Sequence, residues 1–310
     1  MKKNIYSVMF HHFHNEIHKP SQGSLSGQDF RSMIEWLKFN YTLIGAKDYN
    51  QKIQNNTLKD HEVCLSFDDA LKSQYDIAIP ILNEYGLDAF FFIYSSVFDE
   101  NPSLLEIYSY FRNTYYENIE KFYIEFFESV KNKNPKKYKS KHLIFKDLNY
   151  LSSFPFYSEN DKWYRYLRDK FLEGNDYKNI MEDLMKQKKF DFDSAKKILF
   201  MTEEDVIDID KKGHLVGLHS YSHPTQMGKL SRIEQEFEYR KNYNHLKELI
   251  GKPITTMSHP CGNYNEDTLE ILSELNIKIG FRSSLFPSNI QSSLEIPRDD
   301  QTNILKIMNQ

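Results

Sequence analysis

The stretch CLSFDDA, residues 64–70, places two adjacent carboxylates directly after a short apolar run. Residues 63–67 predict a buried strand, so Asp68 and Asp69 should lie at its carboxyl end. Like charges side by side repel each other, and a strand end that serves only the fold has little use for both. A bound metal ion would hold such a pair together. The structural alternative is a loop in which one carboxylate caps the next helix.

Around this stretch, short apolar runs alternate with helical patterns. The expected strands cover 5–10, 63–67, 89–94, 214–218, 254–257 and 277–281. The expected helices cover 26–40, 74–85, 202–212, 231–250 and 265–275. In the first helix one face is apolar and should pack into the core, and it consists of Phe30, Met33, Ile34 and Leu37. Strands that alternate with helices predict a parallel α/β arrangement.

Residues 99–195 differ in character, because aromatic residues recur there at helical spacing and β-branched runs are few. The spacing from Leu104 to Phe126 predicts one long amphipathic helix or two shorter ones. The basic run 131–141 is expected to be a solvated loop. We therefore divide the chain into an α/β part, residues 1–98 and 196–310, and a helical insertion, residues 99–195.

Composition narrows the class of protein. The chain has 310 residues, a formal net charge of −4 and a pI of about 6.3, so neither nucleic acid nor an anionic membrane is expected as its main partner. No apolar run approaches the ~20 residues of a membrane helix, and His11 and His12 end the N-terminal run too early for a secretory signal. The only cysteines, Cys64 and Cys261, provide no disulfide framework. We expect a cytoplasmic protein.

A second motif, HSYSHP at residues 219–224, contains two histidines four residues apart. The preceding GHLVGL predicts a strand, so His219 and His223 should lie in a turn at its carboxyl end, where α/β barrels carry catalytic groups. Two histidines at this spacing can bind one metal ion, although ordinary surface-loop histidines are the simpler explanation of the motif alone. Together with one carboxylate they form a ligand set that leaves coordination positions open. The second carboxylate is then available as a general base.

A third motif, SHPCGNY at residues 258–264, follows another expected strand. Proline and glycine make its loop rigid, and a backbone N–H there could face a developing oxyanion. Taken alone, this motif is an ordinary turn.

In this order the three motifs resemble the polysaccharide deacetylases, carbohydrate esterase family 4. The most specific part is MTEEDVIDIDKKGHLVGLHSYSHP, residues 201–224, and VMFHHF at 8–13 and IPRDD at 296–300 are also similar to family segments. The resemblance covers residues 1–98 and about 196–300. It implies an irregular β/α barrel, with the helical insertion outside the resemblance.

The resemblance also implies roles, position by position. Asp68 matches the catalytic base, and the metal ligands are matched by Asp69, His219 and His223, with Zn²⁺ as the expected divalent ion. Cys261 stands where a backbone N–H helps to hold the oxyanion. The implied reaction is metal-dependent hydrolysis of an N-acetyl group on an amino sugar or glycan intermediate.

The chain departs from the family pattern at three places. Ala70 replaces the usual glycine after the aspartate pair, and Ser258 stands where many members carry an arginine that orients the base. Arg298 is our candidate for that missing arginine. The late Leu-x-His motif, whose histidine protonates the leaving amine, is absent from the terminal NILKIMNQ, residues 303–310.

Another residue must therefore supply the proton if the protein is an enzyme. His11 is the first candidate, because it follows a strand and should face the same end of the barrel as Asp68. The sequence is equally compatible with a His11 that lies in a structural or solvated loop and has no catalytic role. His12 and His259 are weaker candidates for the acid, and for His12, His14 and His18 the structural role is favoured.

Two other functions remain open at this stage. The missing Leu-x-His motif would suit a non-catalytic carbohydrate-binding relative, although such a protein has no need of the spare Asp68. An esterase or amidase that acts on a non-sugar substrate is the second alternative. The sequence gives neither the identity of the substrate nor the oligomeric state.

Overall fold

The structure is a computed structural model that describes residues 5–99, 102–151 and 157–309. The chain divides into two compact units. The first, the α/β unit, consists of Met1–Ser103 and Lys196–Gln310, and the second, the helical unit, of Leu104–Ala195.

The α/β unit is built on one parallel sheet with the strand order β10-β1-β5-β6-β7-β8-β9, in which β4 also pairs with β5. Its strands are β1 (Ser7–Phe10), β4 (Thr42–Leu43), β5 (Glu62–Asp68), β6 (Phe90–Ile93), β7 (Leu215–Leu218), β8 (Thr256–Ser258), β9 (Ile279–Phe281) and β10 (Asp299–Asp300). A separate pair is formed by β2 (Phe13–His14) and β3 (Leu25–Ser26). The predicted parallel α/β arrangement is confirmed.

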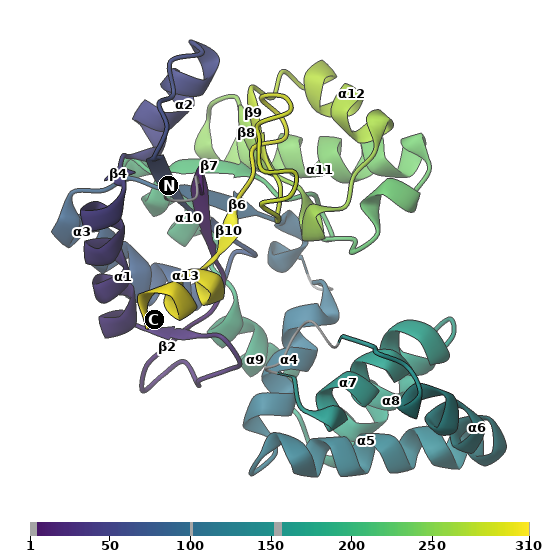
Figure 1. Ribbon diagram of the computed structural model, residues 1–310. Helices are drawn as coiled ribbons and strands as arrows, with labels where there is room; N and C mark the ends of the chain where they lie inside the picture. The colour runs from purple at the N-terminus through teal and green to yellow at the C-terminus, as the bar shows by residue number, and fades with distance from the viewer. Residues whose placement is uncertain (1–4, 100–101, 152–156, 310) are drawn as a thin grey trace. The chain divides into compact units, whose positions relative to one another are not determined.

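One short segment near the C-terminus contacts both ends of this strand order. Ile296 pairs in parallel with Phe281 of β9, and three residues later Asp299 pairs with Val8 of β1. The sheet therefore curls into an irregular β/α barrel, with β10 beside β1 (Figure 1). The side chain of Arg298 lies between these two pairings and is 1 % exposed.

Helices surround the sheet of the α/β unit (Figure 1). They are α1 (Gly27–Asn40), α2 (Ala46–Gln54), α3 (Ile79–Tyr85), α10 (Glu203–Lys211), α11 (Arg232–Ile250), α12 (Glu266–Glu274) and α13 (Gln301–Met308), and α9 (Phe192–Leu199) leads into the unit from the helical unit. Side chains fix where several of them begin, because Ser26, Thr202 and Ser231 each accept a hydrogen bond from a backbone N–H of the first turn. The four residues expected in the core on α1 are fully buried.

The expected helix at 74–85 has a more complex form. It begins as a π-helical turn, Gln74–Ala78, and continues as α3. It ends at Gly86, whose φ of +62° suits a residue without a Cβ.

The helical unit contains α4 (Leu104–Thr114), α5 (Ile119–Lys133), α6 (Pro135–Lys146), α7 (Glu159–Tyr166), a π-helical turn (Leu167–Phe171) and α8 (Asp176–Gln187). The spacing from Leu104 to Phe126 thus belongs to two helices rather than one. No helix among the described residues is both long enough and apolar enough to cross a membrane.

The prediction of a loop at 131–141 is wrong. The first three residues of this basic run end α5, and α6 begins at Pro135, where the side chain of Asn134 accepts a hydrogen bond from the backbone N–H of Lys137. Proline is well suited to the first helical position, and lysine is a good helix former. The exposed lysines form the solvated face of two helices, not a loop.

Candidate active site

The candidate residues lie where neighbouring parallel strands end. Asp68 is the last residue of β5 and Asp69 follows it, while His219 follows directly after β7 and Ser258 ends β8. Because β5 to β8 are adjacent and parallel, their carboxyl ends meet at one edge of the sheet. The fold therefore brings the first two motifs together, although about 150 residues separate them along the chain.

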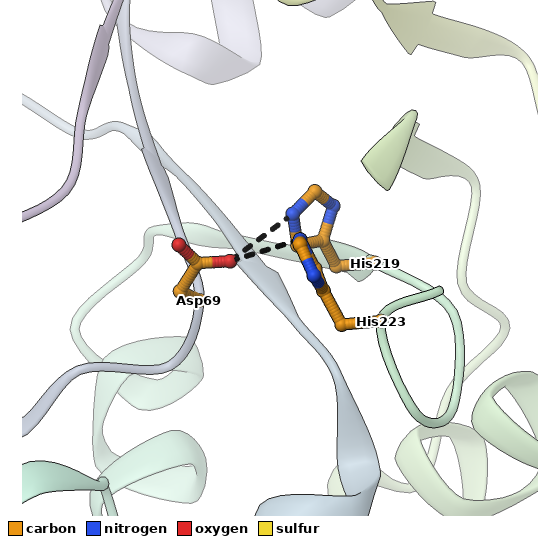
Figure 2. A group of neighbouring side chains, drawn as sticks. All are labelled: Asp69, His219 and His223. Carbon is orange, nitrogen blue, oxygen red and sulfur yellow. Dashed lines mark ion pairs between the residues drawn. The ribbon is translucent and has the colours of Figure 1, made fainter. Parts of the chain in front are cut away.

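Three buried side chains converge there (Figure 2). The Oδ1 atom of Asp69 lies 3.3 Å from Nε2 of His219 and 3.3 Å from Nε2 of His223. Ligands about 2.0 Å from a tetrahedrally coordinated zinc ion are separated from one another by roughly 3.3 Å. The two distances from Asp69 Oδ1 thus suit ligands that share one divalent metal ion.

Hydrogen bonding fixes the orientation of one of these imidazoles. His219 Nδ1 donates to the carbonyl oxygen of Ser258, 2.8 Å away, which leaves the Nε2 lone pair directed toward Asp69. Asp69 Oδ1 is buried and accepts no hydrogen bond from the described residues. A carboxylate oxygen and an imidazole lone pair that face each other need a proton or a cation between them, so the donor set fits a divalent metal.

The charges of this cluster act on its pKa values. Burial alone would lower the pKa of His219, but the carboxylates of Asp68 and Asp69 outweigh it and raise that pKa. Burial alone would raise the pKa of Asp69, but the neighbouring histidines, His223 foremost, hold it well below its usual value. Each partner therefore favours the charged form of the other.

A glutamate on α11 holds the turn between the two histidines. The carboxylate of Glu238 accepts hydrogen bonds from the backbone N–H groups of Tyr221 (3.0 Å) and Ser222 (2.7 Å) and from the Ser222 hydroxyl (2.6 Å). The turn needs this support because Ser220 and His223 have φ values of +62° and +56°, a backbone conformation that residues other than glycine rarely adopt.

The backbone at the end of β5 also has a left-handed conformation. Asp69 has a φ of +79° and Ala70 one of +53°. A glycine, the residue expected after the pair from the family resemblance, adopts this conformation without steric cost. Alanine keeps the same turn at a cost of about 1 kcal/mol.

Asp68 is paired with Arg298, deep in the barrel. The guanidinium forms two hydrogen bonds to the carboxylate, Nη1 to Oδ1 at 2.8 Å and Nη2 to Oδ2 at 2.7 Å. Its other three N–H groups donate to the carbonyl oxygen of Arg282 and to the hydroxyls of Ser66 and Ser258. All five donors are satisfied, so the arginine is held rigidly and in turn holds the carboxylate.

This pairing sets the ionisation of Asp68. Burial would raise the pKa of the carboxyl, but the Arg298 charge and then the neighbouring His219 outweigh burial and lower it. Asp68 is thus ionised at neutral pH and can accept a proton. Its Oδ2 atom lies 3.9 Å from His219 Nε2, beside the ligand atoms.

His11 lies on the accessible side of the cluster. It follows β1, and its Nε2 is 4.0 Å from the Oδ2 of Asp69, with 29 % of its side chain exposed. The buried amide of Gln74 donates to the backbone carbonyl oxygens of His11 (2.9 Å) and Asp68 (2.6 Å), which ties the two strand ends together.

His259 is not a suitable proton donor, contrary to its place among the weaker candidates. It is fully buried, its Nε2 donates to the carbonyl oxygen of Leu294 at 2.9 Å, and its ring stacks on Tyr264 at 4.1 Å. Burial lowers its pKa to about 3, so the ring is neutral at physiological pH. His259 serves the fold.

The other histidines of the N-terminal segment differ in their contacts. His18 Nε2 bonds to Asp76 at 2.8 Å and so ties the N-terminal segment to the π-helical turn before α3, whereas His14 Nδ1 bonds to the nearby hydroxyl of Ser24 at 2.8 Å. The ring of His12 lies beside that of His11, with 6.4 Å between the centroids.

Cys261 lies in the short 3₁₀ turn Pro260–Gly262 that follows β8. Its φ is +53°, and the turn is closed by hydrogen bonds from Gly262 N to His259 O and from Asn263 N to Pro260 O. The loop is therefore rigid and leaves the sheet at the edge that carries the metal ligands.

Sequence reasoning missed the residues that position this site. Besides Glu238, Asn242 on α11 accepts from the backbone N–H of His219 and donates to the carbonyl oxygen of Ile93. The available signal was the spacing of Gln235, Glu238 and Asn242, because polar residues at i, i+3 and i+7 of one helix share a face, and here that face is buried.

Comparison with known proteins agrees with this geometry. The family model described as polysaccharide deacetylase matches residues 55–110 and 179–280, which include all three motifs. The chain belongs to the polysaccharide deacetylase family, whose activity is the deacetylation of carbohydrates. No curated protein matches the sequence.

Solved structures share the fold at low sequence identity. The Streptococcus pyogenes deacetylase PplD, in complex with acetate, is 14 % identical, with 99 % of this chain and 97 % of that chain covered and a TM-score of 0.56. IcaB from Ammonifex degensii is 12 % identical over the same shares, with a TM-score of 0.59. A de-N-acetylase from Aggregatibacter actinomycetemcomitans is 14 % identical, with 94 % and 92 % covered and a TM-score of 0.54.

Proposed function

We propose that the protein is a metal-dependent hydrolase that removes an N-acetyl group from an amino sugar or a glycan intermediate, with Zn²⁺ as the ion. The observation that carries the proposal is the ionised Asp68, held by Arg298 beside the three potential ligands Asp69, His219 and His223. A protein that only binds sugar has no need of such a base next to a metal site.

The ion, when bound by these ligands, would polarise the acetyl carbonyl and lower the pKa of water. Asp68 accepts a proton as the water oxygen attacks the carbonyl carbon. Arg298 keeps the Asp68 carboxylate ionised and fixed in direction before the substrate arrives.

Cleavage then needs a donor, because an amine anion is a very poor leaving group. His11 is the proposed acid, since its ring lies by the ligand cluster and is open to solvent. It delivers a proton to the amide nitrogen as the carbon–nitrogen bond breaks, which gives acetate and a free amino group. The backbone N–H of Cys261 is the proposed donor to the oxygen that carries the developing negative charge.

The test is turnover of N-acetylated sugars by the purified protein with added Zn²⁺, measured as acetate release and as free amine. We expect both products in equal amounts from at least one N-acetylhexosamine oligomer, and no release after the metal is removed with a chelator. Asp60→Asn, which changes an exposed aspartate, is the matched control and should turn over normally. Sugar binding without acetate release would favour the non-catalytic alternative, and cleavage of aryl acetates alone would favour the esterase.

A further inference from the structure

The helical unit contains an arginine, Arg112, that has no counter-ion in the described part of the chain. Arg112 on α4 is half-buried, with its guanidinium carbon 5.0 Å from the ring centroid of Tyr164 and 5.8 Å from that of Phe122. Its Nε donates to the carbonyl oxygen of Tyr108, and the Nη atoms have no hydrogen-bond partner within the described residues. No carboxylate of the described residues forms an ion pair with Arg112, so a permanent charge is enclosed without compensation.

The groups around this guanidinium are donors as well. The hydroxyls of Tyr164 and Tyr177 lie 2.6 Å apart, so one donates to the other and one O–H remains to be used. Tyr108, 5 % exposed, packs edge-on against Tyr177, and its buried hydroxyl has no hydrogen-bond partner among the residues that the structure describes. Buried donors without acceptors are costly and are usually matched by a ligand or water.

A second cation faces the same tyrosines. The guanidinium carbon of Arg168 lies 5.9 Å from the ring centroid of Tyr164, and its charge, like that of Arg112, acts on the hydroxyl of Tyr177. The nearby carboxylates are already engaged, because Asp169 pairs with Arg168 and Glu182 with Lys178. Arg168 is therefore paired with a carboxylate, and Arg112 is the arginine of this cluster that no carboxylate of the described residues neutralises.

We propose that Arg112 and the hydroxyls of Tyr108, Tyr164 and Tyr177 form a binding site for an oxyanion, carried by a phosphorylated or a carboxylated ligand. Guanidinium groups bind phosphate and carboxylate oxygens through paired hydrogen bonds, and tyrosine hydroxyls add donors at the same point. The site is separate from the metal ligands in sequence and lies wholly within the helical unit.

The test compares anion binding by the full-length protein and by Arg112→Met. Isothermal titration calorimetry at low ionic strength uses methyl phosphate in one arm and glucuronate in the other. We expect saturable binding of at least one probe, weakened about tenfold or more in Arg112→Met. The arm that binds more tightly identifies the ligand as phosphorylated or carboxylated. An anion bound at the metal ligands would be unaffected by this substitution.

Thermal unfolding supplies a second readout. Without a probe, Arg112→Met should melt no lower than the wild type, because it removes an uncompensated charge, and the rise in melting temperature with the probe should disappear. Arg165→Met, a matched change at an arginine that lies over Tyr157, should behave as the wild type. Equal affinities in wild type and Arg112→Met, or an equal loss in Arg165→Met, would overturn the proposal. If Arg112→Met does not fold, Tyr177→Phe decides, and unchanged affinity in that variant counts against the site.

Discussion

Arg298→Met tests the interaction on which the proposed base depends. The substitution removes the two hydrogen bonds to Asp68, of 2.8 and 2.7 Å, at a side chain that is 1 % exposed. Asp68 itself is 2 % exposed, so its charge would remain buried without a partner. Loss of one partner of a buried pair costs about 3–5 kcal/mol of the free energy of unfolding. For a unit of this size, each kcal/mol lowers the melting temperature by about 2–4 °C, so we expect a drop of roughly 6–20 °C.

The reasoning also fixes the behaviour of the double variant. Arg298→Met with Asp68→Asn removes both charges, so it should be more stable than Arg298→Met alone, even though it carries one more substitution. Thermal and urea unfolding of the wild type, both single variants and the double variant complete the cycle. A loss below about 1 kcal/mol in Arg298→Met, or a double variant no more stable than Arg298→Met, would refute the role of Arg298 as the counter-ion of the base.

Three further predictions concern the site and the barrel that carries it. Glu238→Ala should weaken zinc affinity by about 10–100-fold, because it releases the turn that carries His223. Glu236→Ala, a change on the same helix at a half-exposed glutamate that pairs with Arg240, should leave the affinity unchanged, and equilibrium dialysis with metal analysis measures both variants. Burial lowers the pKa of His214 to about 4, and its Nδ1 accepts a hydrogen bond from the backbone N–H of Ala89, so the folded state favours the neutral ring. The contribution of His214 to the free energy of unfolding is therefore present above pH ~6.5 and is lost as the pH falls toward 4, by up to about 3 kcal/mol. Urea unfolding between pH 7.5 and 4.5 should therefore show a weaker pH dependence in His214→Gln, and an identical dependence would contradict this assignment. His11→Ala should slow acetamide hydrolysis far more than hydrolysis of an aryl acetate, whose leaving group needs no proton, and equal losses on the two substrates would remove His11 from the acid role.

Local sequence signals were sufficient for the parts of the fold that depend on short-range physics. The apolar run before Asp68 forms the strand β5, as expected. Ser26, Thr202 and Ser231 cap the helices that were expected to begin there. The strand β10 has only two residues and pairs with β1 from the opposite end of the chain, so no periodicity could indicate it. Charge density misled at 131–141, because a run of lysines suits both a loop and the outer face of a helix.

The candidate site was predictable to the extent that it consists of chemically distinctive residues. The two aspartates and the histidine pair form a plausible metal site by residue type and spacing, and the family resemblance assigns Asp68 as the base and the other three as ligands. Arg298 could be proposed from the sequence, but its five hydrogen bonds go to three other segments of the chain and depend on the closed barrel. The burial that makes His259 a structural residue, and the contacts that make Glu238 a support, likewise arise only from tertiary packing.

The most direct test of the central claim compares Asp68→Asn with Asp69→Asn, through zinc content and turnover measured on the same preparations. Asp68→Asn should keep its zinc and lose turnover by roughly 10²–10⁴-fold, because it removes the base and leaves the ligands in place. Asp69→Asn should lose zinc at ordinary concentrations and regain part of its activity when the metal is in excess. An Asp68→Asn protein that no longer binds zinc, or an Asp69→Asn protein that binds zinc as the wild type does, would contradict the assignment of Asp68 as base and Asp69 as ligand.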